Sequence, residues 1–176
     1  MKLNEIRDVN TPSSGIAGDE VFDGKKLAPK GVRREEWPKD LDLSNRRTIT
    51  TLKGCPRVIR GNFIASLTKI ENLDGAPEEV YGSVLLARTK ITSLKDIHKH
   101  IKKCEHLNIS TLSIRGPMLG VLKIEGLNYI SFPYGKNAEK AAQIINKYLK
   151  QPFGNKRVME CQSELLDAGL DEFAEL

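Results

Sequence analysis

Two residues with metal-binding side chains, His100 and Cys104, are four positions apart, so they would share one face of a helix, and His106 follows closely. Imidazole nitrogen and thiolate sulfur are common zinc ligands. Cys104 also fits the apolar stripe of the same predicted helix, however, and the sequence offers no evident fourth ligand. We therefore predict that the chain has no metal site and no cofactor.

The remaining nucleophilic and acidic side chains do not form a pattern typical of catalysis. The cysteines Cys55, Cys104 and Cys161 each occupy a repeat or helix position that explains them as small buried residues. The acidic pairs Glu35-Glu36 and Glu78-Glu79 are adjacent, so their side chains would point to different sides of the chain. No nucleophile elbow, phosphate-binding loop or His-Glu metal motif occurs. The sequence predicts that the protein is not an enzyme.

Positive charge gathers around one short predicted helix and the turns beside it. Such a cluster can bind phosphate groups, but it is also typical of a solvated helix face. No aromatic residues are interleaved with these charges, which disfavours a single-stranded nucleic acid as the partner. The predicted basic patch comprises Lys95, Lys99, Lys102, Lys103, Arg57 and Arg60.

Charge is distributed unevenly along the chain, which has a formal net charge of +5. Residues 158–176 contain six acidic and no basic side chains, whereas residues 1–157 contain 28 basic against 17 acidic ones, a net charge of +11. A basic body with an acidic tail suits an anionic partner such as nucleic acid. Alternatively, the tail packs on the body and the charges offset each other.

Three features favour a cytoplasmic protein, or one carried inside a particle. The three cysteines lie far apart and form neither a CxxC pair nor a disulfide framework. Residues 1–10 contain no apolar run, so we expect no signal peptide. Apolar stretches are only a few residues long, so no membrane span is expected.

The elements that position these side chains follow from an internal repeat. Leu52-Lys53-Gly54-Cys55-Pro56 matches Leu73-Asp74-Gly75-Ala76-Pro77 at an offset of 21 residues. At the same offset Ile70 matches Ile91, and the next unit is two residues longer, because Ile91 matches Ile114. A weaker fourth unit follows around Leu122 and Ile124. Stacked units of this length predict a β-rich (α/β) solenoid of about four coils with parallel strands.

Within each predicted coil, alternate strand residues such as Val84 and Leu86 point inward, and the Gly-x-Pro segments supply return turns. The third unit replaces its turn with a helix bearing Leu94, Ile97, Ile101 and Cys104. Helices are predicted at 137–150, 159–168 and 170–176, and they would cap the solenoid. The predicted domains are an extended or partly disordered arm at 1–36, the solenoid at 37–132 and a C-terminal helical cap at 133–176.

The units resemble leucine-rich repeats of the short glycine- and proline-containing kind that is abundant in tailed bacteriophages. The best-matched stretch runs from Gly61-Asn62-Phe63 to Gly75-Ala76-Pro77, and the segments 144–149 and 160–165 look similar to the ends of such phage proteins. The sequence departs from the family where an asparagine or cysteine ladder is usual, because Thr68, Thr89 and Leu112 stand there. We therefore expect that ladder to be weak or absent.

The resemblance implies that the outer face of the strands binds a partner. Ile64, Leu67 and Leu85 would form an apolar patch there, which is typical of an interface, unless the N-terminal arm or a second copy of the chain covers it. The predicted partner-binding residues are Asn62, Ile64, Ser66, Leu67, Leu85, Ala87, Arg88, Asn108 and Ser110.

The sequence thus predicts a non-catalytic protein–protein interaction module. Its family resemblance implies a phage-encoded protein acting in the host cytoplasm as an adaptor, a virion-internal protein or an inhibitor of a host factor. The alternative is a nucleic-acid-associated protein that binds through the basic body. The sequence does not identify the partner or the oligomeric state.

Overall fold

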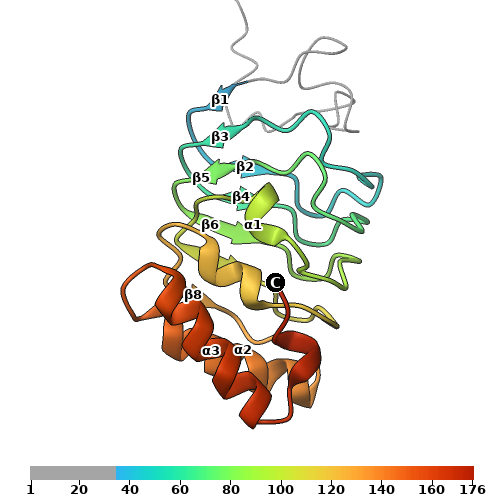
Figure 1. Cartoon of the computed structure of the whole chain (residues 1–176). Coiled ribbons are helices and arrows are strands. Elements are labelled where there is room, and N and C mark those ends of the chain that lie inside the picture. The colour runs from blue at the N-terminus through green and yellow to red at the C-terminus, as the bar shows by residue number, and fades with distance from the viewer. Residues whose placement is uncertain (1–34) are drawn as a thin grey trace, which may run out of the picture.

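The chain winds into about four stacked coils that build two parallel sheets (Figure 1). This computed structural model describes residues 35–176, so the predicted arm at 1–36 lies outside the described residues except for its last two. Sheet A has the order β1 (Glu36–Trp37), β3 (Val58–Ile59) and β5 (Glu79–Val80). Sheet B has the order β2 (Leu41–Asp42), β4 (Phe63–Ile64), β6 (Ser83–Leu85), β7 (His106–Asn108) and β8 (Tyr129–Ile130). The predicted solenoid with parallel strands is confirmed.

The interior of the coils is a column of apolar side chains at the predicted spacing. Phe63 pairs with Val84 in sheet B, and Val84 pairs with Leu107, which reproduces the offsets of 21 and 23 residues read from the sequence. All three side chains are fully buried, as are Ile70 and Ile91 on the third side of the coil. Since no single coil could bury these side chains alone, stacking supplies the driving force for the fold.

Two kinds of tight turn let the chain change direction within each coil. After sheet B, the equivalent residues Asn45, Leu67, Arg88 and Thr111 adopt left-handed conformations with φ between 58° and 69°. Leu67 and Arg88 were predicted at outward strand positions, and that placement is wrong, because both lie in this turn. In the return turn, Gly75 has φ of +82°, and a Cβ atom there would lie 2.6 Å from the Cα atom of Lys53. Only glycine fits this position.

The helix of the third coil, α1 (Ile97–His100), is shorter than the stripe from Leu94 to Cys104 suggests. Asp96 precedes α1 in a left-handed conformation, and Ile101 is already extended. The chain must straighten there because Lys103 forms bridges to Glu79 and Glu125, which continue sheet A into later coils. The packing of neighbouring coils overrides the helical periodicity of this segment.

A helical cap closes the C-terminal end of the solenoid, as predicted (Figure 1). Its elements are the short helix η1 (Leu119–Lys123), α2 (Lys136–Leu149), α3 (Asn155–Asp167) and η2 (Asp171–Phe173). The predicted helix at 159–168 begins earlier, at Asn155 directly after Gly154, and the predicted helix at 170–176 is only the single turn of η2. None of the helices in residues 35–176 has the length and apolar character that a membrane span requires.

Two buried polar side chains fasten the cap to the coils. Asn146 of α2 donates its amide to the carbonyl oxygen of Ile130 at 2.8 Å and accepts the Ile130 backbone N–H at 2.8 Å. Arg157 of α3 donates to the carbonyl oxygen of Leu122, through Nε at 3.1 Å and also through Nη2. Asn146 therefore occupies the hydrogen-bonding position that a further strand beside β8 would take.

Candidate functional site

The outer face of sheet B carries the apolar pair that the sequence predicted for partner binding. Ile64 and Leu85 are paired in the register of β4 and β6, between the buried residues Phe63, Ala65, Val84 and Leu86. Strand alternation turns both side chains away from the core, and both are half-buried. The structure brings these two residues together as one aliphatic patch.

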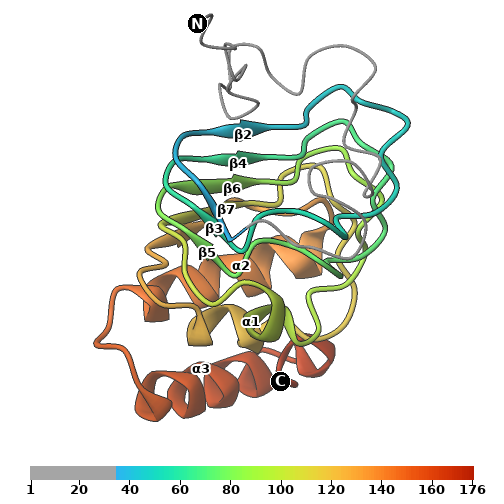
Figure 2. The ribbon, with the colours of Figure 1, turned by 90° about the horizontal axis from the view of Figure 1, so that it is seen from above.

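No described helix lies over this patch. Figure 2 shows α1 and α3 on the opposite side of the coils from β2, β4 and β6. Helix α2 packs against β8 at the last coil and against η1. The cap helices therefore close one end of the solenoid, α1 lies on the opposite side of the coils, and no described helix covers the outer face of sheet B.

An aromatic pair that the sequence prediction missed lies at the last strand of the same sheet. Tyr129 pairs with the outward residue His106, and its ring meets that of Phe132 edge to face at a centroid distance of 6.2 Å. The two side chains are 42% and 41% exposed. Aligning Leu107 with Ile130 in the sequence places Tyr129 at an outward strand position, and this alignment could have revealed the pair. Exposed aromatic side chains are enriched at protein interfaces.

The polar residues that were predicted to contact a partner instead form hydrogen bonds with other residues of the chain. Asn62 donates its backbone N–H to Oδ1 of Asp40 at 2.7 Å and accepts the backbone N–H of Ser83 at 2.8 Å. A Cβ atom on Gly82 would lie 2.5 Å from Oδ1 of Asn62, so glycine makes room for this side chain. Asp40, Asn62 and Ser83 form a polar ladder that ties three successive coils together.

A second polar group joins the later coils of sheet B. Oδ1 of Asn108 accepts hydrogen bonds from the hydroxyls of Ser110 at 2.7 Å and Ser131 at 3.2 Å. Ser131 in turn accepts the backbone N–H of Ile109 at 2.7 Å. Asn108 and Ser110 therefore stabilise the sheet. Ser66 and Ala87, also predicted for binding, are half-buried and follow β4 and β6.

Thr68 and Thr89 stand where leucine-rich repeats usually carry an asparagine or cysteine ladder, and their side chains do not connect neighbouring coils. The Thr68 hydroxyl donates to the carbonyl oxygen of Ala65 at 2.7 Å within its own turn. The Thr89 hydroxyl is buried and has no hydrogen-bond partner among residues 35–176. In the first coils the polar side-chain ladder instead starts at Asp40 and Asn62, each directly before a strand of sheet B, and it ends at the backbone N–H of Ser83, the first residue of β6.

The predicted basic patch lies largely on the outer face of sheet A, where acidic residues of neighbouring coils neutralise it. Glu35 accepts from Arg57 at 2.8 Å, and Glu36 accepts two hydrogen bonds from Arg60, each at 2.9 Å. Glu78 lies 2.9 Å from Lys102. The hydrogen bonds from Arg60 hold the pKa of Glu36 below its ordinary value.

Two other members of the basic patch are also paired. Lys99 lies 3.0 Å from Asp96, whose pKa is lowered by that hydrogen bond, and Lys103 lies 4.0 Å from Glu125. The Tyr81 ring lies between Arg60 at 4.6 Å and Lys103 at 4.4 Å. Of the six predicted residues, Lys95 alone has no ion pair within the described part of the chain. The patch is therefore an alternating charge ladder.

The residues considered for metal binding and nucleophilic chemistry do not assemble into a site. His100 Nε2 lies 4.0 Å from Oδ1 of Asp74, whereas Cys104 is buried in the core. Burial raises the pKa of the Cys104 thiol and of the Cys161 thiol to about 12. Across residues 35–176, no group of three or more His, Cys, Asp or Glu side chains is placed to hold a metal ion.

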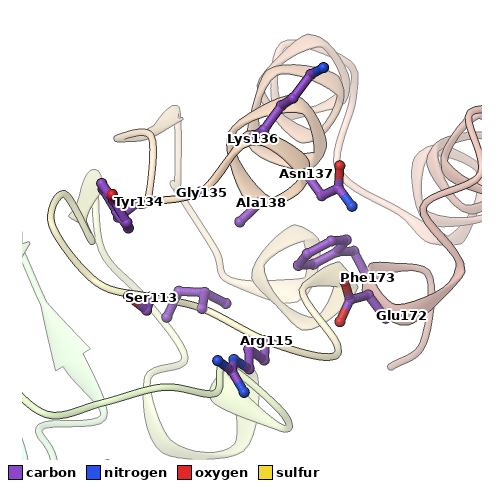
Figure 3. Close-up of a pocket in the computed structure, with 10 residues that line it drawn as sticks. Ser113, Arg115, Tyr134, Gly135, Lys136, Asn137, Ala138, Glu172 and Phe173 are labelled. Atoms are coloured by element: carbon purple, nitrogen blue, oxygen red, sulfur yellow. The ribbon is translucent and has the colours of Figure 1, made fainter.

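A cleft of about 440 Å³ lies between the fourth coil, which contains β7, and the cap. Figure 3 shows Phe173 of η2 facing Ala138 of α2 across it, while Arg115 lies on the solenoid side and the Lys136 side chain is directed away. The lining residues are Ser113, Ile114, Arg115, Tyr134, Gly135, Lys136, Asn137, Ala138, Glu172 and Phe173.

Comparison of the chain with protein-family models, with curated proteins and with solved structures found no match.

Proposed function

We propose that the chain is a non-catalytic protein-binding module and that the outer face of sheet B is its binding surface. The observation that carries the proposal is the adjacency of Ile64 and Leu85 on a sheet face that no described helix covers. Tyr129 and Phe132 extend the surface at the last strand with exposed aromatic area. An apolar centre with aromatic side chains near it is the composition that protein interfaces favour.

The polar neighbours of this surface support the same function. Asp40, Asn62, Asn108 and Ser131 are already hydrogen-bonded within the sheet, so they hold the backbone of the surface in place. A rigid sheet loses little conformational entropy when a partner binds. Binding energy would come mainly from burying Ile64, Leu85 and the aromatic pair.

The proposal includes the origin that the repeat resemblance implies. The coils would be leucine-rich repeats of a tailed bacteriophage, and the protein would act in the host cytoplasm or inside the virion. The 21- to 23-residue spacing and the C-terminal segments that look similar to phage proteins support this part of the proposal.

The test compares the partners of three tagged proteins in nuclease-treated bacterial lysate. These are the natural chain, the Leu85→Arg variant and the Thr50→Arg variant, whose exposed position lies on the third side of the first coil. We expect one dominant protein to be retained by the natural chain and by Thr50→Arg and to be lost with Leu85→Arg, because a charge in the apolar patch opposes burial.

The folding of Leu85→Arg must be measured beside its binding. We expect a far-UV circular dichroism spectrum like that of the natural chain, because the Leu85 side chain is only half-buried. A protein retained equally by all three chains contradicts the proposed surface. A Leu85→Arg chain that is unfolded calls for Ile64→Lys in the same comparison, with the same expected loss.

A further inference from the structure

The solvent-facing side of α2 is a stripe of lysines. Lys136, Lys140, Lys147 and Lys150 are all exposed, and at 3.6 residues per turn they fall within an arc of about 80°. The opposite side of the helix, with Ala138, Ala141, Ala142, Ile145 and Leu149, is buried against the solenoid and α3. These four residues are called the lysine stripe below.

Most of the lysine stripe lacks the neutralising partners that the ladder on sheet A possesses. Lys147 is the exception, at 2.5 Å from Glu164 of α3. For Lys136, Lys140 and Lys150, no carboxylate within residues 35–176 lies within ion-pair distance. These three lysines therefore form a local group of unpaired positive charge on a cap in which residues 133–176 contain six basic and seven acidic side chains.

The placement of the first lysine works against the stability of α2. Lys136 is the first residue of the helix, where the partial positive charge of the backbone N–H groups disfavours a cation. The cleft beside this helix end is lined by both Arg115 and Glu172, and Glu139 lies in the first turn of α2. Lys136 itself is a cation that the helix end does not favour, and an external anion would be attracted to it on the solvent side of α2.

One exposed aromatic residue precedes α2 in the sequence and another follows it. Tyr134, just before α2, is 75% exposed, and Phe153, shortly after it, is 62% exposed. The Phe153 ring lies 4.7 Å from the guanidinium carbon of Arg157, which holds one face of the ring. Nucleobases stack on exposed aromatic rings beside basic tracks.

We propose that the lysine stripe binds the phosphodiester backbone of single-stranded nucleic acid, with bases stacking on Tyr134 and Phe153. Helix α2 offers a basic track roughly 20 Å long. A membrane surface fits less well, because the apolar side of α2 is already used to pack the cap and cannot enter lipid. The lysine stripe is separate from the outer face of sheet B, so a negative result for nucleic-acid binding would not contradict protein binding by sheet B, and the reverse also holds.

The test measures the anisotropy of a fluorescent 20-nucleotide mixed-sequence single strand against added protein, over a series of salt concentrations. One variant carries Lys136→Gln, Lys140→Gln and Lys150→Gln together. The matched control carries Lys95→Gln, Lys99→Gln and Lys102→Gln, which removes the same formal charge near α1. Lys147 is left intact because it ties α2 to α3.

We expect the α2 variant to bind at least about tenfold more weakly than the natural chain at low salt and to lower the salt-dependence slope by about 2. The control should retain most of the affinity. Tyr134→Ala should weaken binding about tenfold with an unchanged slope, since stacking involves no counterion release.

Three results would overturn the proposal. They are no binding of the single strand by the natural chain, equal losses in the two triple variants, or binding only to vesicles of anionic phospholipid. Each variant is checked by its melting temperature, which we expect to be unchanged because all substituted lysines are exposed.

Discussion

At the scale of single residues, outward-facing polar side chains stabilise this solenoid more than their exposure suggests. The side-chain amide of Asn62 donates to Asp40 in the previous coil and accepts the backbone N–H of Ser83 in the next one, so one amide connects three coils. The repeat spacing predicted that Asn62 points outward, but not that its hydrogen bonds run along the solenoid. That pattern needs the positions of Asp40 and Gly82, which are 22 and 20 residues away.

His98 is a residue whose protonation should affect stability. Its Nδ1 atom is buried without a hydrogen-bond partner among the described residues, and it packs over Gly120 of η1. Burial lowers its pKa, and Lys123 lowers the pKa further. Protonation therefore favours the unfolded chain. The stabilisation by neutral His98 is complete above the ordinary histidine pKa of about 6.5 and declines as the pH falls below it.

We predict that the melting temperature falls between pH 7.5 and pH 5.5, and that His98→Gln removes part of that fall. Differential scanning calorimetry of both chains at the two pH values measures the difference. His106→Gln, at an exposed position on β7, is the control and should behave like the natural chain. Identical pH dependence in the natural and His98→Gln chains would contradict this account.

At the scale of elements, the cap is defined by how α2 meets β8. The Asn146 amide supplies one donor and one acceptor to the backbone of Ile130, and no further strand pairs with β8 within residues 35–176. A helix can thus end a parallel sheet through one side chain. Unpaired sheet edges otherwise promote self-association.

We predict that Asn146→Leu destabilises the chain by about 3 kcal/mol, because it leaves two buried backbone groups without partners. Urea unfolding measures the loss, and analytical ultracentrifugation should show concentration-dependent association that the natural chain lacks. Asn137→Leu, at an exposed position near the start of α2, is the matched control. Equal stability of the Asn146→Leu and natural chains would rule out this role of Asn146.

The sequence predicted the coils better than it predicted their helices. Apolar alternation and the Gly-x-Pro turns determine which face of a strand is buried, so the register of Phe63, Val84 and Leu107 was predicted correctly. Helix ends depend on non-local contacts. The length of α1 is limited by the bridges of Lys103, which pair residues more than 20 positions apart.

Local patterns in the sequence predicted the apolar part of the candidate site, but they did not predict the charge pairs that join neighbouring coils. Ile64 and Leu85 follow from alternation alone, whereas the pairing of Arg57 with Glu35 and of Lys102 with Glu78 appears only when charges are compared one coil apart. Lys140, Lys147 and Lys150 needed no such comparison, because they share one face of the predicted helix at 137–150, whereas Lys136 lies just before that range. Lysines close together in sequence at 95–103, by contrast, are mostly paired with acidic residues in the fold.

At the scale of the whole molecule, the coils form one continuous core and should unfold cooperatively. We predict that Ile91→Asp destabilises the chain by more than about 4 kcal/mol, because it places a charge in the fully buried column. The neighbouring exposed change Thr92→Asp should have little effect. Circular dichroism melting of both variants tests this, and an unchanged melting temperature for Ile91→Asp would contradict the assigned register.

The whole molecule also separates its surfaces by chemistry. The outer face of sheet B is apolar at its centre, the outer face of sheet A is a neutralised charge ladder, and α2 carries unpaired lysines. A protein partner bound to the outer face of sheet B should therefore not compete with an anion bound to the lysines of α2.

The measurement that tests the central proposal most directly is site-specific photo-crosslinking of the captured partner. The photoreactive residue p-benzoylphenylalanine is placed at Leu85 on sheet B, at Thr50 on the third side, or at Lys140 on α2. We predict a crosslinked complex from position 85 and none from positions 50 and 140. A complex formed from position 50 or 140 but not from position 85 would show that the protein partner binds elsewhere.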